Sequence, residues 1–456
     1  MKNILLLNLL LFLAIGSYAQ SNFSTSLHAT REGKKEAYKT ENGGMELITN
    51  VPMEDLTCTK CHSGTGLYPN GETIDTDTYE PSCKDCHDFD QGNTVAETTC
   101  INCHNRQKYE RAAYPDVDVH QAAGITCIEC HKKEELHGDD GVAYSSLYEQ
   151  GAIKVECEDC HTTLADNTSH NTHEATVDCA ACHAAGVLTC ASCHFETVVA
   201  TGVNRAINQI KNYRLLVKKE DGKIGLGAFM THTYDGKTNY IVNAYHSHAI
   251  TKNATTCSDC HYNMGESNVA IGEYNESGTI RMTTWNADTK KIDGPTGVVP
   301  LPSDWKTSLI LDFATYTGDE TVFPSDPEAW TYLTSEVDNS HLYFAEPLDD
   351  ATLTKLGFTR LPTTKVDEMF GSEINQIYPN PFNERTFIKY SIDQSSDVSI
   401  KIFDALGRMV KSIELTAQAP GDHEIEISAE GFSEGIFYCN LKANGKTSVH
   451  KMIHRK

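Results

Sequence analysis

The feature that most constrains this chain is a five-residue motif, Cys-X-X-Cys-His, which occurs eight times. Such a unit indicates covalent attachment of a c-type haem. Two cysteines three apart on a helical turn point the same way, so both sulfurs can reach one porphyrin, and the next histidine can bind the iron. The motifs comprise Cys58, Cys61 and His62; Cys83, Cys86 and His87; Cys100, Cys103 and His104; Cys127, Cys130 and His131; Cys157, Cys160 and His161; Cys179, Cys182 and His183; Cys190, Cys193 and His194; and Cys257, Cys260 and His261.

A single unit of this kind could instead bind zinc or act in thiol exchange. Eight copies, each followed directly by histidine, favour the haem interpretation, so we expect eight covalently bound haem c groups as cofactors. The sixth and seventh motifs are separated by only six residues, Ala184 to Thr189, which span at most roughly 20 Å. Their two haems are therefore expected to be close neighbours.

The first nineteen residues have the pattern of a secretory signal peptide. Lys2 precedes an apolar run from Ile4 to Ile15, and small residues end the segment at Ala19. A membrane anchor is the alternative, but the run is shorter than the about 20 apolar residues that a spanning helix needs. The pattern predicts an exported, soluble protein that begins near Gln20.

The octahaem domain is expected at residues 20–261, and from Cys58 to His194 it has little sustained helical or strand periodicity, with linkers rich in Asp, Thr, Gly and Glu. Such a segment cannot build an ordinary apolar core. We therefore expect a loop-rich α core with little regular secondary structure, organised by the haems, whose porphyrin faces are the buried apolar surface. Without haem it should be largely unfolded.

Residues 195–256 interrupt this array without a motif. Strand-like runs on either side of Asp221-Gly222, and another after Asp235-Gly236, predict a β-hairpin excursion. Residues 262–372 are also free of motifs and are expected to form a loop-rich cap, with a small independent β domain as the alternative. A short helix is predicted from Asp350 to Leu356, ended by Gly357.

The number of histidines bears on what the irons can do. A haem with two protein ligands passes electrons, whereas a catalytic haem needs an open position. Twelve histidines lie outside the motifs, and three of them, His423, His450 and His454, belong to the C-terminal segment. The remainder would supply every iron with a second histidine and leave one over. The candidate distal ligands are His28, His120, His137, His170, His173, His232, His246 and His248, with His341 as the ninth histidine, remote from the motifs.

The last residues, 373–456, alternate apolar and polar positions between Gly, Asn and Asp turns, which predicts a small β-sandwich. Cys439, the cysteine outside the motifs, is expected to be a small buried hydrophobe, with a reactive thiol as the alternative. The order of Ile377-Tyr-Pro-Asn-Pro-Phe382, Val398 to Asp404, Leu406-Gly-Arg408 and Gly435-Ile-Phe-Tyr438 resembles the C-terminal sorting domain of type IX secretion substrates.

That resemblance implies haem attachment in the periplasm, passage across the outer membrane by the type IX machinery, and removal of the domain with release or attachment at the cell surface. The upstream region is similar to multihaem c-type cytochromes in its motifs and little else. A net charge of −25 makes nucleic acid an improbable partner.

These features predict an extracellular or cell-surface octahaem cytochrome that relays electrons between the outer membrane and an external redox partner through closely packed, mostly bis-histidine haems. No catalytic residue is assigned, and a non-enzymatic carrier is favoured. The alternative is an octahaem reductase of a small nitrogen or sulfur compound, such as nitrite, hydroxylamine or tetrathionate, with one open haem. A third hypothesis is a homopolymer filament in which His28 or His341 ligates a haem of the next subunit.

Overall fold

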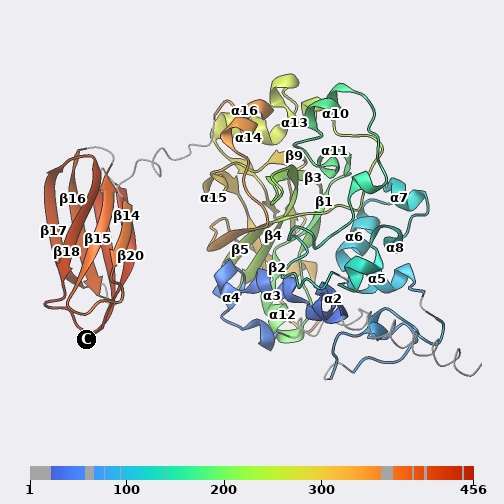
Figure 1. Ribbon diagram of the computed structural model, residues 1–456, viewed down its shortest axis with the longest axis horizontal. Helices are drawn as coiled ribbons and strands as arrows, with labels where there is room; N and C mark the ends of the chain where they lie inside the picture. Colours follow the sequence, from blue (N-terminus) through green and yellow to red (C-terminus); the bar gives the residue numbers. More distant parts are fainter. Residues whose placement is uncertain are drawn as a thin grey trace, which may run out of the picture. The chain divides into compact units, whose positions relative to one another are not determined.

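The computed structural model describes residues 22–56, 66–75, 78–92, 94–138, 140–360, 373–392, 395–404, 408–443 and 446–455. The chain divides into two compact units, Met1–Leu361 and Pro362–Lys456 (Figure 1). The expected signal peptide, residues 1–19, and the first motif, Cys58 to His62, lie outside the described residues. Among the residues that are described, no helix has the length and apolar character to cross a membrane.

Most of the motif region consists of short helical turns joined by loops. In three motifs a Ser or Thr precedes the first cysteine and an acidic residue stands three positions later, which forms a capping box. In one of them the Thr126 amide donates to Glu129 Oε2 over 2.6 Å. The helical segments before residue 190 are η1 (Phe23–Thr25), α2 (Leu27–Thr30), α3 (Glu32–Tyr38), η2 (Thr40–Asn42), α4 (Glu46–Thr49), η3 (Met53–Asp55), η5 (Cys83–Asp85), α5 (Glu97–Cys103), α6 (Asn105–Ala113), α7 (Val119–Ala122), α8 (Cys127–Cys130), α9 (Lys133–Leu136), η6 (Cys157–Asp159), α10 (Thr168–His173) and α11 (Cys179–His183).

The centre of the first unit is a seven-stranded sheet in which the main path runs β1-β3-β4-β5-β13, while β2 pairs with β4 and β9 with β3. Its strands are β1 (Val187–Ala191), β2 (Cys193–His194), β3 (Asn208–Lys218), β4 (Ile224–Tyr234), β5 (Lys237–Ala244), β9 (Gly297–Pro300) and β13 (Asn339–Tyr343). The turn between β4 and β5 has positive φ at Asp235 (48°) and Gly236 (73°), as a two-residue hairpin requires. The excursion thus forms three long strands.

The motif-free stretch after residue 261 contributes β9 and β13 to this sheet, so the expected cap is continuous with the excursion. The predicted short helix is α16 (Asp350–Leu356), and Gly357 ends it with φ 98°. The other elements from 195 to 360 are α12 (Phe195–Thr201), α13 (Cys257–Cys260), η7 (Tyr262–Met264), α14 (Val269–Ser277), β6 (Ile280–Arg281), β7 (Thr284–Asn286), β8 (Lys291–Asp293), α15 (Trp305–Ser308), β10 (Leu309–Ile310), β11 (Phe313–Tyr316), η8 (Pro327–Ala329) and β12 (Trp330–Thr334).

The larger apolar core of the first unit is built around the sheet, and a smaller one joins N-terminal segments to α12. The larger core contains fully buried side chains such as Tyr213, Leu215 and Phe229, together with residues of α14 and β11. The motif helix α11 contributes Ala181 to this core and packs against β4, while α6, which follows the third motif, packs against β1 (Figure 1). The sheet is therefore the support on which the motif segments rest.

The second unit is β-rich and consists of two sheets, ordered β14-β15-β18 and β17-β16-β19-β20. Cys439 is fully buried in the shared apolar core, where burial raises the pKa of its thiol to about 12 and makes it a poor nucleophile. The predicted turn at Leu406 and Gly407 lies outside the described residues. The strands are β14 (Glu373–Tyr378), β15 (Arg385–Ile392), β16 (Ser396–Asp404), β17 (Met409–Gln418), β18 (Gly421–Ser428), β19 (Gly435–Ala443) and β20 (Lys446–His454).

Candidate haem sites

The two cysteines of a motif share one helical turn in six of the seven described motifs. These turns are η5, α5, α8, η6, α11 and α13, and in each the backbone bends so that side chains three positions apart face the same side. The motif of Cys190 and Cys193 differs, because Cys190 lies on β1 and Cys193 on β2, with Ser192 at φ 43° between them. The expected helical turn is absent there because these strands pair with β3 and β4.

Six motif histidines each lie beside one histidine from outside the motifs. The distances between ring centroids fall within a narrow interval, from 6.0 to 6.3 Å. Every pair joins a motif histidine to a candidate distal histidine. The pairs are His87 with His137, His104 with His28, His131 with His248, His161 with His120, His183 with His170, and His261 with His173.

This spacing is the one that a shared metal ion requires. A bond between a metal and an imidazole nitrogen is about 2.0 Å, and the ring centre lies roughly 1.1 Å beyond, so two imidazoles on opposite sides of one ion have centroids roughly 6.2 Å apart. Aromatic pairs in direct contact range over about 4.5 to 7 Å, whereas the six histidine pairs all fall in the narrow interval that one shared ion sets. The six pairs therefore fit a haem iron between their rings.

The ring nitrogens are oriented for the same purpose. His183 Nδ1 lies 3.1 Å from the carbonyl oxygen of Thr251, and His261 Nδ1 lies 2.8 Å from that of Lys355. Such a contact places the proton on Nδ1 and leaves the Nε2 lone pair for a metal. Equivalent Nδ1 contacts to backbone carbonyls, each 2.9 Å, occur at His170 and His173.

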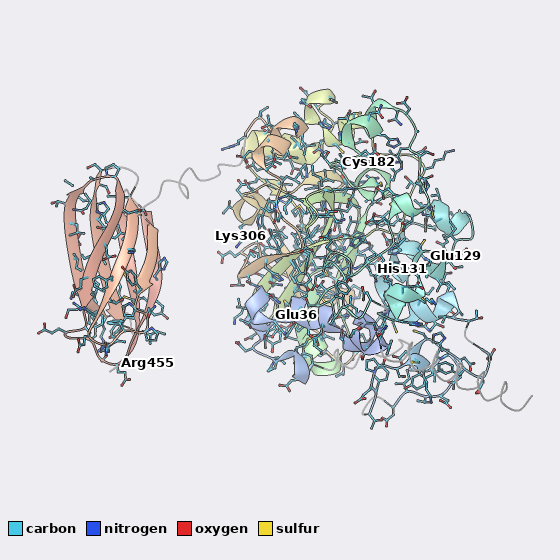
Figure 2. All side chains as sticks on the ribbon, in the orientation of Figure 1. Glu36, Glu129, His131, Cys182, Lys306 and Arg455 are labelled. Carbon is cyan, nitrogen blue, oxygen red and sulfur yellow. The ribbon has the colours of Figure 1, made fainter. Side chains whose placement is uncertain are left out.

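One imidazole has a carboxylate in place of a carbonyl. His131, labelled in Figure 2, has its Nδ1 atom 2.7 Å from Glu135 Oε1. Burial alone would raise the pKa of Glu135, but hydrogen bonds from the His131 ring and the Lys154 amide outweigh burial and the pKa is lowered. Glu135 is thus ionised at neutral pH. Sequence reasoning missed this residue, although its position four residues after His131 was a usable signal.

Burial keeps distal candidates neutral. His28 has its pKa lowered to about 4, first by burial and then by the neighbouring His104 ring. The pKa of His248 is lowered by the same two causes, burial and then the His131 ring. A neutral imidazole is the form that binds a metal, so both are in the ligating state at neutral pH.

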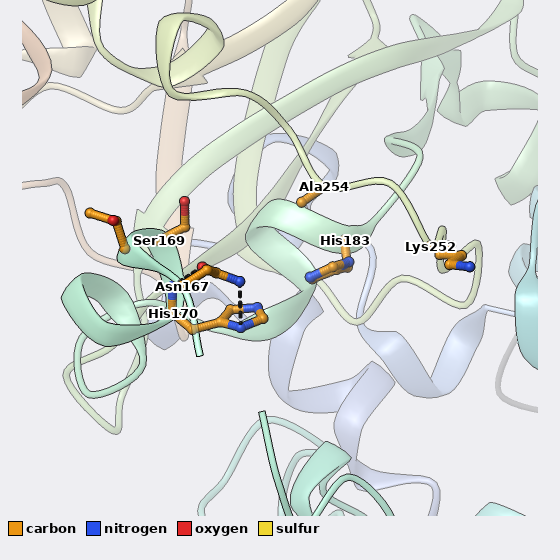
Figure 3. Close-up of a pocket in the computed structure, with 7 residues that line it drawn as sticks. Asn167, Ser169, His170, His183, Lys252 and Ala254 are labelled. Carbon is orange, nitrogen blue, oxygen red and sulfur yellow. Dashed lines mark hydrogen bonds between the residues drawn. The ribbon is translucent and has the colours of Figure 1, made fainter. Parts of the chain in front are cut away.

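A pocket of about 510 Å³ opens between His170 and His183 (Figure 3). Its lining includes Asn167, whose side-chain amide lies 3.2 Å from His170 Nδ1, and the amine-bearing side chain of Lys252. Ligand pockets commonly enclose about 300 to 1,000 Å³. The size and the two facing rings suit a flat cofactor with an acidic edge, whose carboxylate Lys252 could neutralise.

The cysteines of successive motifs lie near one another. Burial raises the pKa of the Cys86 thiol, and the nearby Cys100 and Cys103 thiols raise it further. The Cys100 thiol contacts that of Cys127. Farther along, burial raises the pKa of the Cys130 thiol, and the nearby Cys160 thiol raises it further. The Cys157 and Cys179 sulfurs lie within 4.8 Å of one another. The pKa of the Cys182 thiol is in turn raised by burial and by the nearby Cys257 thiol. The six helical motifs therefore follow one another in space as a continuous series.

The expected close step between the haems on Cys182 and Cys193 stays a prediction. Burial is the main cause that raises the pKa of the Cys182 and Cys193 thiols, and the charges that come next are those of Cys179, Arg214 and Cys257 at Cys182 and of Cys190 at Cys193. The two segments contact β4 in different ways: α11 packs against it, whereas β2, which carries Cys193, pairs with it in the sheet. The seventh motif thus differs from the six helical motifs in being part of the sheet.

Three histidines do not face a motif imidazole at this spacing. His232 stands opposite Cys193 in the strand pairing and contacts the Asn239 amide. His246 stacks on Tyr148, with centroids 5.7 Å apart. His341, on β13, is 8% exposed, and neither ring nitrogen has a hydrogen-bond partner among the described residues. The distal candidates His232 and His246 are therefore separate from the pairs.

Two family models match parts of this chain. Residues 376–455 match the secretion system C-terminal sorting domain. That domain directs export, so the protein is secreted or placed on the outer cell surface by the type IX machinery. Residues 46–105 match cytochrome c7 and related cytochrome c, which identifies a multihaem domain with covalently bound haem c and a role in electron transfer.

Solved structures are similar over small parts only. One is PorZ, a surface component of the type IX secretion system of Porphyromonas gingivalis, with 17% identity, 21% of this chain and 13% of that chain covered, and a TM-score of 0.16. Another is latent PorU from the same organism, with 23% identity, 17% and 9% coverage, and a TM-score of 0.15. This chain thus spans a small fraction of either protein. A comparison with curated proteins gives no match.

Proposed function

We propose that this protein is an extracellular or cell-surface octahaem cytochrome that relays electrons between the outer membrane and an external redox partner. The observation that carries the proposal is the set of six histidine pairs, which would give the haems of six motifs two protein ligands each. An iron with both axial positions filled exchanges electrons without binding substrate. The export domain supports the location.

The chain's own residues act by positioning. The haem supplies the redox chemistry when bound. The motif cysteines would hold each porphyrin edge at a helical turn, and Nδ1 contacts such as that of His183 to Thr251 would fix the angle of each ring. The short distance between Cys157 and Cys179 supports closely packed neighbours. Such rigid spacing favours transfer from haem to haem.

Filament formation is less supported. A histidine that ligates a neighbouring subunit has to be accessible in the single chain. His28 lies beside His104 of the same chain, with centroids 6.0 Å apart, and His341 is 8% exposed. Both residues are therefore occupied or enclosed within one protein molecule, which favours discrete particles.

The decisive test uses two histidines that are neighbours in sequence. His248 faces His131, whereas His246 stacks on Tyr148, and burial lowers the pKa of both. In the secreted holoprotein, His248→Ala should convert one low-spin haem to high spin in the electron paramagnetic resonance spectrum. His246→Ala, the matched control, should leave the low-spin count unchanged. Equal effects of the two substitutions would contradict the proposed ligand pairs.

Electron relay itself is tested by stopped-flow mixing of the reduced protein with an acceptor too large to reach buried haems. All haems should be reoxidised together, because the series conducts. If only one haem were reoxidised, the relay would have to be given up.

A further inference from the structure

His194 belongs to the motif that departs from the others, yet its backbone is that of a ligating motif histidine. Its φ and ψ are −80° and 99°, close to the −81° and 99° of His131. Its Nδ1 atom is anchored as well, 3.2 Å from Thr197 Oγ1 and 3.5 Å from Glu320 Oε2. The imidazole therefore has the orientation in which Nε2 is left for a metal.

What differs is the other side of the ring. His194 Nε2 lies 3.2 Å from Glu196 Oε2, and the ring meets Tyr316 and Trp330 edge-on, with centroids 6.0 and 6.2 Å away. No second imidazole stands there among the residues that the structure describes, which include every histidine outside the motifs. Of the nine that lie before the C-terminal segment, six face other motif histidines.

The three remaining distal candidates are held elsewhere. Opposed residues in paired strands point to the same face, so His232 shares a face with Cys193, while His194 shares the other with Thr233. His246 is stacked on Tyr148. His341 lies on β13 and pairs with Ile241 of the neighbouring strand β5. None of them is positioned to approach the Nε2 side of His194.

Charged groups gather around this ring instead. Arg205 is 2% exposed; its Nε donates to Thr197 Oγ1 over 3.0 Å, and its guanidinium lies 4.1 Å from the Tyr316 ring centre. Its Nη1 atom is buried without a hydrogen-bond partner among the described residues. The second carboxylate oxygen of Glu196 accepts from the Asp235 amide over 2.6 Å. Buried polar atoms without partners are costly in a closed core, and they are expected where a polar ligand enters.

We propose that the haem bonded to Cys190 and Cys193 is a ligand-binding haem, with His194 on one side and a place for a small exogenous molecule with a lone pair, of the size of carbon monoxide or cyanide, on the other. Were haem bound there, His194 Nε2 would hold the iron in place of its contact with Glu196, and the Glu196 carboxylate would be a polar group near the bound molecule that could hold a proton. This inference rests on the proposed haem loading and adds a distinct coordination state to one site.

The test begins with the mass of the secreted holoprotein and of its peptides, which counts haems independently of their coordination. A general lack of haem would refute the proposed function, whereas a lack confined to the Cys190 peptide would overturn this inference alone. The dithionite-reduced protein is then titrated with carbon monoxide. The double variant Cys190→Ser, Cys193→Ser should bind one equivalent less than the parent protein.

Its matched control is Cys179→Ser, Cys182→Ser, which should lose one low-spin haem and bind carbon monoxide in unchanged amount. Unchanged binding after loss of Cys190 and Cys193, or no binding by the parent protein, overturns the proposal. A milder variant guards against misfolding: Glu196→Gln should keep all haems and shift the infrared stretching band of bound carbon monoxide. Glu134→Gln, on the exposed face of α9, should leave the band in place, and equal bands in all three proteins refute the role of Glu196.

Discussion

Replacing Glu135 by glutamine should raise the reduction potential of the haem held between His131 and His248. The Glu135 carboxylate lies 2.7 Å from His131 Nδ1, and its side chain is 8% exposed. With a metal–nitrogen bond of about 2.0 Å beyond the ring, the carboxylate is roughly 7 Å from the iron. A negative charge at that distance stabilises the ferric state, and its removal favours the ferrous state.

The size of the effect follows from Coulomb's law. At an effective dielectric constant of about 20, two unit charges roughly 7 Å apart interact by about 2.4 kcal/mol. For a one-electron couple this corresponds to about 100 mV, since a tenfold change in equilibrium constant is about 59 mV. The glutamine keeps a hydrogen-bond acceptor for Nδ1, so we expect an increase of about 50 to 100 mV in one haem.

The measurement is a spectroelectrochemical titration of the whole protein, in which one of the component potentials moves. Glu134→Gln is the matched control, because Glu134 is on the same helix but 51% exposed and paired only loosely with Lys133 at 3.7 Å. It should shift no component by more than about 20 mV, given screening by water and salt. If both substitutions gave the same shift, or if Glu135→Gln lowered a potential, the reasoning about this hydrogen bond would be refuted.

Three further outcomes are expected. Removal of residues 373–456 should leave the absorption spectrum unchanged and retain the protein in the periplasm, measured by cell fractionation, because the sorting domain is a separate unit. Burial and then the neighbouring His341 lower the pKa of His232 to about 4. Because the unfolded chain takes up the proton first, acidification from about pH 6.5 to about pH 4 should destabilise the first unit by up to about 3 kcal/mol. His232→Phe should reduce this pH dependence in urea unfolding; an unaltered slope would argue against it. Cys439→Asp should destabilise the second unit and abolish secretion, whereas Cys439→Ala should lower stability by only about 1 kcal/mol, as seen by thermal unfolding.

Local features of this chain could be predicted from sequence because their causes are local. The capping pattern around Cys127, the turn at Asp235 and the end of a helix at Gly357 each depend on a few adjacent residues. Six of the eight distal candidates lie beside a motif imidazole. They were selected by residue type and by their place outside the motifs, and that they bind iron stays a prediction.

The partners could not be predicted, because they are set by the tertiary fold. His137 follows the motif of His131 in sequence but faces His87, and His173 passes over the nearer motif of His183 to face His261. Likewise β9 and β13 join the sheet beside strands that are remote in sequence, which no period in the sequence indicates. The departure of Cys190 to His194 from a helical turn has the same origin, since strand pairing with β4 overrides the local preference of the motif.

The crossing of histidine partners has a consequence for biogenesis. His28 faces His104, His87 faces His137, and His131 faces His248, which follows the whole excursion in sequence. Each iron would therefore be bound by two segments that are synthesised at different times. The iron bound by His131 would lack its second ligand until His248 has been synthesised, however early the haem is attached. A chain halted before that point would hold haems with an empty position, which are prone to capture stray ligands and reactive oxygen. The sorting domain follows all the paired histidines in sequence, so a chain that can be recognised for export already contains both members of every pair.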